Sequence, residues 1–419
     1  MPSAAADTAA GDILGVYQNS TGLFSTTCPA SAESGNCWWW AADTFMALFD
    51  YAENNSGTMN TTRLANIASI KSDFANTFSA FCNGGCPAGA DDEGVSPFDN
   101  HWYDDMGYWE QALINAYEYT KTSKYLYAAE QLWNNVTDEG YMEDCGLIVQ
   151  QNADASKPEL EDGFANSLYV RDSAWLYEIT GNAKYMSGKT DGKGGAIGVA
   201  GNVRSEMTNQ VAGTPSPGTP GSEFFIAGET DPSSGCTAAT GTQKWLSTQG
   251  EMVNAYADLS VAYAAYCPPA TTCTANISLF ANLADELATT VTTNTSLTNP
   301  ATVFGTPAIL SEPCESQTTP STWPDGCTIG GPNTNQFSQF LIFKGNFERG
   351  AYCSLHNFND GALRVFIQNN ADAIANLPHF GFLWEPGSDA NVNFGTRASI
   401  LDGLEAYIAG STLMCAGGS

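Results

Sequence analysis

Two neighbouring aspartates, Asp104 and Asp105, lie inside an aromatic run, His101-Trp-Tyr-Asp-Asp-Met-Gly-Tyr-Trp109. Hydrolysis of a glycosidic bond needs two carboxyl groups, a nucleophile and a proton donor, and flat aromatic faces hold a sugar ring by stacking. The pair also fits a plain helix start, because Asp is a favoured N-cap and complements the helix dipole in the first turn. The aromatic setting favours the catalytic interpretation, since charges beside apolar rings are costly to bury.

The elements that must position this pair are helices. From Trp109 to Tyr117, apolar residues recur at spacings of three and four, and similar stripes begin at Trp38, Phe164 and Met252. The sustained alternation that is typical of a strand is not evident. The pattern predicts about a dozen helices, over residues 5–17, 38–54, 62–81, 105–120, 123–135, 162–180, 196–211, 247–266, 275–292, 335–350, 358–377 and 394–410.

Helices in this number and order predict an all-α fold, an (α/α)6 barrel or six-hairpin toroid, formed by residues 1–419 as a single domain. The sequence Tyr-Glu-Tyr-Thr at 117–120, followed by Lys-Tyr, is echoed at 177–180 as Tyr-Glu-Ile-Thr, again followed by Lys-Tyr. Each copy is expected to end one helix, turn, and begin the next. Inner helices of such a barrel converge on one end, where we expect the long loops 186–244 and 295–335 to shape a cleft rim.

The charge of the chain restricts its partners. It has 45 acidic and 15 basic residues, a formal net charge of −30, which repels phosphate backbones and anionic membrane surfaces. Nucleic acid is therefore an unfavourable partner. No apolar segment has transmembrane or signal-peptide length, so we expect a mature, soluble chain without a membrane span, and a monomer.

The 12 cysteines indicate disulfides and hence a secreted, extracellular protein. Four pairs are close enough in sequence for local bridges, Cys28 with Cys37, Cys82 with Cys86, Cys267 with Cys273 and Cys314 with Cys327. Cys145, Cys236, Cys353 and Cys415 remain for longer bridges. Without a Cys-x-x-Cys pair, clustered histidines or a calcium loop, we expect no metal and no cofactor. Six Asn-x-Ser/Thr sequons, at Asn19, Asn54, Asn60, Asn135, Asn276 and Asn294, are typical of a glycoprotein.

At this point a resemblance can be stated. Residues 102–120, WYDDMGYWEQALINAYEYT, resemble the Asp-Asp motif of glycoside hydrolase family 76, the endo-α-1,6-mannanases and related fungal cell-wall enzymes. Residues 163–185, 248–259, 340–350 and 380–387 are similar to later family segments in the same order, so the resemblance spans roughly residues 10 to 410.

The resemblance implies a six-hairpin barrel that hydrolyses or transglycosylates α-1,6-linked mannose with retention. Asp104 would be the nucleophile and Asp105 the general acid and then base. Physical chemistry agrees, because neighbouring carboxyls on one helical turn can approach the separation of about 5–5.5 Å that retaining enzymes use. Two carboxyls this close also cannot both ionise freely, so one keeps its proton.

Further substrate-binding residues are expected around the pair. Aromatic candidates are Trp39, Trp102, Tyr103 and Trp245, and candidates for sugar-hydroxyl contacts are Asp43, Asn166, Gln249 and Lys344. The chain departs from the family at Met106, at Tyr108, where a tryptophan is usual, and after Cys145, where a Gly-Gly-rich aromatic stretch is missing. These departures bear on which glycan the protein recognises, and they leave the expected catalytic pair intact.

Two alternatives stand beside a secreted α-mannan hydrolase whose partner is an oligosaccharide or polysaccharide. One is a cell-wall transglycosylase of the same fold that acts on mannan or a GPI-type glycan. The other is a non-catalytic, glycan-binding wall protein, because residues 104 and 105 could serve only as a helix start.

Overall fold

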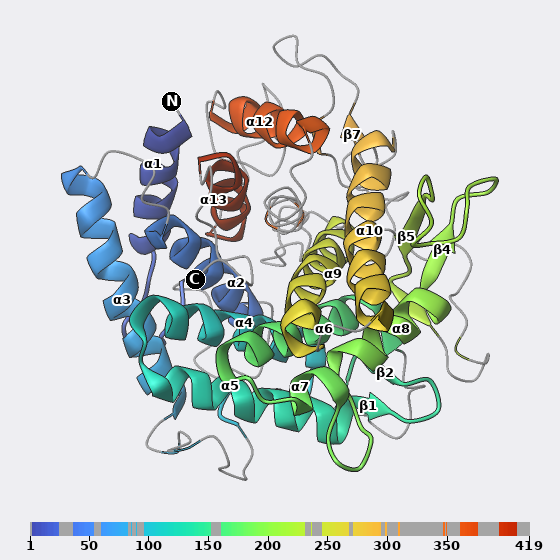
Figure 1. Cartoon of the computed structure of the whole chain (residues 1–419). Helices are drawn as coiled ribbons and strands as arrows, with labels where there is room; N and C mark the ends of the chain where they lie inside the picture. The colour runs from blue at the N-terminus through green and yellow to red at the C-terminus, as the bar shows by residue number, and fades with distance from the viewer. Residues whose placement is uncertain are drawn as a thin grey trace, which may run out of the picture.

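The computed structural model of the chain is a ring of helices (Figure 1). It describes residues 2–24, 37–53, 60–82, 96–151, 161–230, 245–267, 271–294, 361–375 and 394–408, with the short pieces 85, 89, 236, 298–299, 309–310, 347 and 349. The described part is mostly helical, and its helices form an all-α barrel of the (α/α)6 type, as the sequence predicts.

The helices alternate between an inner and an outer ring (Figure 1). The inner helices are α2 (Cys37–Glu53), α4 (Tyr103–Thr120), α6 (Gly163–Thr180), α9 (Leu246–Tyr266) and α13 (Phe394–Ile408). The outer ones are α1 (Pro2–Leu14), α3 (Thr61–Cys82), α5 (Ser123–Asn135), α7 (Lys184–Ser187), α8 (Ala196–Glu206), α10 (Thr271–Thr293) and α12 (Gly361–Ala375). A π-helix, η1 (Val136–Gly140), continues α5.

Most predicted helices are found with shifted ends. The predicted helix 5–17 begins earlier, at Pro2, and 275–292 begins earlier, at Thr271. The predicted helix 196–211 is too long, because α8 ends at Glu206 and residues 208–210 form a strand. The predicted helix 335–350 lies largely outside the described residues, of which Phe347 and Arg349 are helical. The single-domain assignment remains a prediction.

The repeated sequence forms two equivalent helix ends. After α4 and after α6 the backbone enters the left-handed region, at Lys121 with φ 53° and at Gly181 with φ 67°. In both copies the last threonine donates its hydroxyl to the carbonyl four residues earlier, Thr120 to Ala116 and Thr180 to Leu176. The repeat therefore encodes the turn between an inner and an outer helix, as predicted.

Strands in the described residues are two or three residues long and pair only as two-stranded antiparallel ribbons. These are β1 (Tyr141–Met142) with β2 (Leu147–Ile148), β3 (Glu161–Asp162) with β6 (Glu229–Thr230), β4 (Thr208–Gln210) with β5 (Phe224–Ile226), and β7 (Thr298–Asn299) with β8 (Ile309–Leu310). Most of them lie in the loop segments between helices. Besides the predicted helix α8, the long segment 186–244 contains the strands β4, β5 and β6.

Two disulfides are described. Cys267–Cys273 is the local bridge predicted from its spacing, and Cys145–Cys236 joins two of the cysteines left for longer bridges across 91 residues. The second bridge joins the segment before α9 to the β1–β2 ribbon. It stabilises the folded loops because it lowers the conformational entropy of the unfolded chain.

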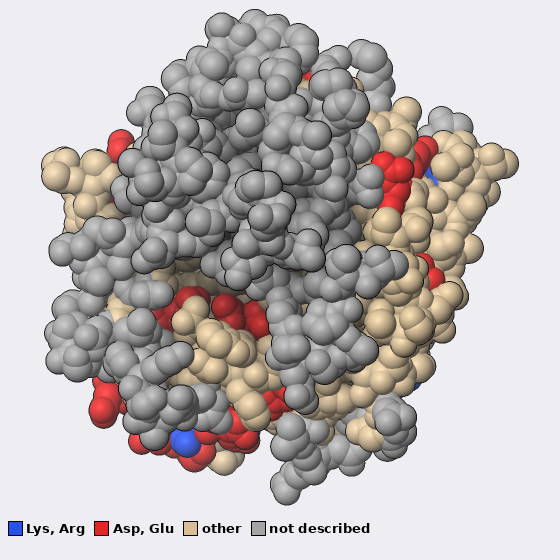
Figure 2. Space-filling model, turned by 180° about the vertical axis from the view of Figure 1, so that it is seen from behind, with Lys and Arg blue, Asp and Glu red and all other residues tan. Residues whose placement is uncertain are grey.

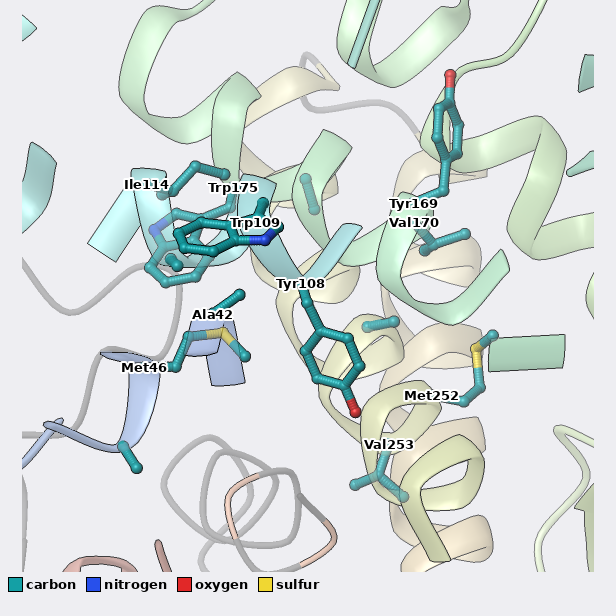
Figure 3. Packing of buried hydrophobic residues seen from close by; sticks show 14 of the residues in the cluster. Ala42, Met46, Tyr108, Trp109, Ile114, Tyr169, Val170, Trp175, Met252 and Val253 are labelled. Atoms are coloured by element: carbon teal, nitrogen blue, oxygen red, sulfur yellow. The ribbon is translucent and has the colours of Figure 1, made fainter. Parts of the chain in front are cut away.

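The inner helices bury apolar side chains together with charged ones such as Arg171, Glu251 and Asp402. Figure 3 shows part of the apolar cluster, with Ala42 and Met46 from α2, Tyr108 from α4 and Val253 from α9. These four residues are at most 2% exposed, so the barrel axis is a packed core. Within the described residues, no helix combines the length and apolarity needed to cross a membrane.

Candidate active site

The inner helices begin at one end of the barrel. Around the ring, α13 contacts α2, α2 contacts α4, α4 contacts α6 and α6 contacts α9. Among them, α2, α4, α6 and α9 are each followed along the chain by an outer helix that runs back, so these inner helices point in one direction (Figure 1). A residue in the first turn of one of them therefore lies at one end of the barrel.

Asp104 and Asp105 occupy this position in the first turn of α4. Both are half-buried. The backbone N–H of Asp105 donates to Oδ1 of Asp104 at 2.8 Å, and the side-chain amide of Asn100 donates to Oδ2 of Asp105 at 2.7 Å. The N-cap position itself is Trp102, whose side chain makes no capping hydrogen bond. The two aspartates therefore follow the cap rather than form it.

The electrostatics of the pair differ from those of an ordinary helix start. Burial raises the pKa of Asp104 well above its ordinary value, and the neighbouring Asp105 raises it further. Burial also raises the pKa of Asp105, to about 7, although the Asn100 hydrogen bond acts against it. A capping aspartate has a lowered pKa, because helix N–H groups and the dipole favour its anion. In this pair the pKa values are raised instead, which favours the protonated form.

A close contact between α4 and α6 holds the first turn of α4 in place. A Cβ atom at Gly107 would lie 2.8 Å from the Cβ of Leu168, so any larger residue would force the two helices apart. On the other side, the buried ring of Tyr103 covers Gly140 of η1, where a Cβ would approach the ring to 2.8 Å. Glycines on both sides thus let α4 pack closely next to the pair.

The predicted aromatic residues divide into exposed and buried ones. Trp102 is 37% exposed, one of the few large apolar side chains at the surface of the described chain, and it directly precedes the pair. Trp39 is 7% exposed and stacks on Tyr108, with ring centroids 5.1 Å apart. Tyr103 is buried, and Trp245 is the N-cap of α9, half-buried at the same barrel end. Stacking on a sugar remains a prediction for all four.

The predicted hydroxyl-binding residues have partners within the protein. The Asn166 side chain binds the backbone N–H and C=O of Ile148, and Gln249 binds those of Ile226. Both are fully buried, so they fasten loop segments to α6 and α9. Their sugar contacts remain predictions that this geometry does not support.

Asp43 is fully buried in α2, and an Arg349 nitrogen lies 3.5 Å from its Oδ1. Burial raises its pKa to about 6, against the effect of Arg349. Lys344 lies outside the described residues. Neither residue is therefore placed beside the pair by the described structure, and their predicted roles stay predictions.

The structure reveals one residue at the pair that the sequence analysis did not select. Asn100 contacts Asp105 directly, and its signal in the sequence was an Asp-Asn step just before an extended N-cap, a pattern typical of side-chain turns. Phe164 of α6 also lies nearby, with its ring centroid 5.1 Å from that of Tyr108.

Two groups of potential metal ligands occur in the described residues. Side-chain atoms of Asp99, His101 and Glu139 lie within 4.8 Å of one another near the pair. Those of Cys145, Glu161 and Cys236 do so as well, but these sulfurs form a disulfide and cannot act as thiolates. The donor set of the first group suits a cation, while the chemistry of the aspartate pair requires none.

The face opposite to that of Figure 1 is hollowed, and acidic side chains gather in the hollow (Figure 2). Basic side chains are sparse on this face. A concave surface that carries mainly carboxyls disfavours phosphates and sulfates and accepts uncharged, hydroxyl-rich molecules.

Comparison with known proteins confirms the resemblance to family 76. Residues 2–188 match the model of glycosyl hydrolase family 76, and this segment contains the aspartate pair. No curated protein sequence matches the chain.

Several solved structures share the fold. One is a Salegentibacter α-1,6-mannanase in complex with α-1,6-mannotetrose, inactivated by replacing two neighbouring aspartates with alanine; it is 15% identical with a TM-score of 0.64, over 97% of this chain and 99% of that one. A family 76 mannosidase from Bacteroides thetaiotaomicron is 12% identical with a TM-score of 0.65, over 97% and 98%. Dfg5 from Chaetomium thermophilum, in complex with glucosamine, is 14% identical with a TM-score of 0.66, over 97% and 90%. At these identities the likeness shows the fold.

Proposed function

We propose that this chain is a secreted, retaining glycoside hydrolase that cleaves α-1,6-linked mannan or a related α-mannoside. One observation carries the proposal: two neighbouring aspartates, next to an exposed tryptophan and with burial raising their pKa values, lie in the first turn of an inner helix of an (α/α)6 barrel. The family model covers the same segment. The mannanase that shares the fold is inactivated by changes at two neighbouring aspartates, which supports a paired role here.

In the proposed reaction, a carboxylate oxygen of Asp104 attacks the anomeric carbon while Asp105 gives its proton to the departing glycosidic oxygen. The C–O bond to the leaving sugar breaks, and a glycosyl ester on Asp104 forms. Asp105, now ionised, takes a proton from water, whose oxygen attacks the anomeric carbon and releases Asp104. Two inversions give net retention.

The pKa values bear on this division of roles. A pKa of about 7 suits Asp105, because it is protonated at mildly acidic pH and can still act as a base after transfer. Burial and the neighbouring Asp105 also raise the pKa of Asp104 well above its ordinary value. Because repulsion leaves one proton on the pair, the productive complex is the one in which Asp105 holds it and Asp104 is ionised.

The test is hydrolysis of defined α-1,6-manno-oligosaccharides by the parent protein and by Asp104→Asn and Asp105→Asn. We expect cleavage by the parent and, in NMR spectra of the first products, the α anomer. If the parent cleaves no α-mannoside, the non-catalytic, glycan-binding alternative is the one that remains. An initial β anomer would reject retention.

A transglycosylase is the second candidate function. The observation in its favour is the similarity to Dfg5, a fungal protein whose solved structure holds glucosamine. A transglycosylase would transfer the mannosyl unit from the Asp104 ester to a sugar hydroxyl instead of water. Mass spectrometry of products formed with and without an added mannobiose acceptor separates the two, because only transfer gives products longer than the donor.

Secretion is part of the proposal. The Cys145–Cys236 and Cys267–Cys273 bridges support an oxidising compartment, since such disulfides rarely persist in the cytosol. A cell-wall location and a monomeric state remain predictions. Both are tested by fractionating the cells that produce the protein and by measuring its mass in solution.

A further inference from the structure

The loop that enters α4 is built from two overlapping side-chain turns. Oδ1 of Asp99 accepts the backbone N–H of His101 at 2.8 Å, and Oδ1 of Asn100 accepts that of Trp102 at 3.0 Å. His101 adopts a φ of 62°, a left-handed conformation that few non-glycine residues adopt without such support. The side chain of Asn100 is therefore held by the backbone on one side and reaches the aspartate pair on the other.

The orientation of the Asn100 amide follows from these partners. The Trp102 N–H can only donate, so the atom that faces it must be the amide oxygen. The amide nitrogen consequently faces Asp105 and donates to its Oδ2 at 2.7 Å. Because an amide NH2 cannot accept a proton, this hydrogen bond defines Oδ2 as an acceptor.

We propose that Asn100 is a positioning residue that determines which oxygen of Asp105 transfers the proton. With Oδ2 engaged as an acceptor, the acid proton of Asp105 resides on Oδ1. During glycosidic cleavage the Oδ1–H bond breaks, an O–H bond to the leaving oxygen forms, and the charge left on Asp105 is stabilised by the N–H of Asn100. The inference rests on the proposed function, because it assigns a partner to the acid/base of that reaction.

The electrostatic surroundings make Asn100 the main donor to this carboxyl. Burial raises the pKa of Asp105, and the Asn100 hydrogen bond is what lowers it. The titratable groups on the first two turns of its own helix, on the preceding loop, and on η1, β3 and α2 are Tyr103, Asp104, Tyr108, Glu110, Asp99, His101, Asp138, Glu139, Glu161, Asp162, Asp43, Asp50, Tyr51 and Glu53. Except for His101 these groups are acidic, so none of the others offers a cation.

Two substitutions distinguish the effect of the amide donor on Asp105 from the effect of the loop turn. Asn100→Asp keeps an oxygen for the Trp102 N–H but replaces the donor to Asp105 with another carboxyl oxygen. Asn100→Ala removes both interactions. We expect kcat/KM for a manno-oligosaccharide to fall about 100-fold in the first variant and about 10-fold in the second, because general acid catalysis typically contributes about 10²- to 10⁴-fold.

A substrate with a better leaving group gives a readout that a merely structural role would not change. In the 2,4-dinitrophenyl glycoside of α-1,6-mannobiose, the dinitrophenolate leaving group needs little protonation. We therefore expect kcat/KM of both variants for this substrate to stay within about 3-fold of the parent value. The alkaline limb of kcat/KM against pH should move to higher pH in both variants, because loss of the donor raises the pKa of Asp105.

The matched control is Asn182→Ala. Oδ1 of Asn182 accepts the N–H of Lys184 at 3.1 Å, the same two-residue turn, at the start of α7. We expect unchanged kinetics and an unchanged pH profile. A shift of the acidic limb in Asn100→Ala would instead make Asp105 the nucleophile and overturn the proposed proton position.

A measurement without substrate keeps this inference separate from the proposed function. In protein labelled with ¹³C at the Asp carboxyl carbons, the Asp105 signal is the one that Asp105→Asn removes, and its titration midpoint should rise in Asn100→Ala. An unchanged midpoint overturns the Asn100 inference even if the parent is active. A shifted midpoint in an inactive parent supports the contact and rejects the hydrolase.

Discussion

Two groups of carboxyls in this barrel, one buried in the core and one half-buried at the barrel end, have opposite relations to positive charge. In the core, Arg171 lies 3.1 Å from Glu251 and 3.3 Å from Asp258, and Arg349 lies 2.8 Å from Asp402 and 3.3 Å from Asp50. At the barrel end, no cation is among the groups that shift the pKa of Asp104 or Asp105.

The difference indicates what each group does. An arginine that shares buried carboxyls joins inner helices that are far apart in sequence, and removing it leaves uncompensated charge in the core. Carboxyls without a cation must instead keep a proton, which is costly for stability and useful for acid catalysis. Glu110 in the core also has a raised pKa without a cation among its causes, so it is the place of Asp104 and Asp105 in the first turn of α4 that distinguishes them.

The largest expected effect is on catalysis. Asp104→Asn and Asp105→Asn should each reduce kcat/KM for α-1,6-manno-oligosaccharides by about 10³-fold or more, because each removes one partner of the double displacement. The free energy of unfolding should stay equal or rise, since Asn removes a group that burial disfavours as an anion. Urea titration measures it, and a large loss of stability would make the pair structural like the core cluster.

The next effect should fall on stability. Arg171→Met should lower the free energy of unfolding by about 3–5 kcal/mol, because Glu251 and Asp258 would lose their buried counter-charge. The control Lys121→Met breaks an exposed pair with Glu118 and should change stability by less than about 0.5 kcal/mol. Urea unfolding of both variants is the measurement, and equal effects would contradict the distinction between core and surface.

The unfolding free energy should also depend on pH. Burial raises the pKa of Glu53 to about 8 and that of Asp73 to about 6, so the folded protein binds protons that the unfolded chain has lost. Stability should be highest at pH 4 or below and fall as the pH rises toward 8. Glu53→Gln should remove about 2 kcal/mol of that fall, after allowance for its partial exposure.

Denaturation midpoints from pH 4 to 8 test this expectation. The control is Glu223→Gln, which changes an exposed carboxyl and should leave the slope unchanged. A stability that rises with pH would contradict the expectation that carboxyls with raised pKa values determine the slope.

The smallest expected effect is that of replacing Trp102, the exposed aromatic residue beside the aspartate pair. Trp102→Ala should raise KM about 5- to 10-fold, equivalent to about 1 kcal/mol of stacking, and leave the unfolding free energy nearly unchanged. The control Leu64→Ala removes another exposed apolar side chain, on α3, and should leave KM unchanged. Steady-state kinetics check both, and an unchanged KM for Trp102→Ala would exclude it as a sugar platform.

The sequence predicted the helices well because their signals are local. Apolar residues that recur three and four positions apart located α4, α6 and α9. The repeat that ends in threonine located the turns after α4 and α6. Helix ends were less certain, because residues after Glu206 pair with a strand that follows 18 positions later. Asp104 and Asp105 could be found for the same local reason, since the pair and its aromatic setting are contiguous.

The partners of polar residues could not be predicted in this way. Asn166 and Gln249 lie on inner helices, as predicted. Their amides, however, bind backbone groups 18 and 23 residues away instead of lying free at a surface. Asp43 is paired with Arg349 across 306 residues. Separations of this size leave no periodic trace in a single sequence.

By itself, then, the sequence determined the helix series, the barrel class and the place of the aspartate pair, because hydrophobic periodicity, turn chemistry and neighbouring carboxyls act over a few residues. Only the tertiary structure decided which carboxyls have a cation, which amides are already engaged and that Asn100 contacts Asp105. The physical reason is that charge and hydrogen-bond balance depend on what lies within a few ångströms in space, and in a closed ring of helices those neighbours come from distant parts of the chain.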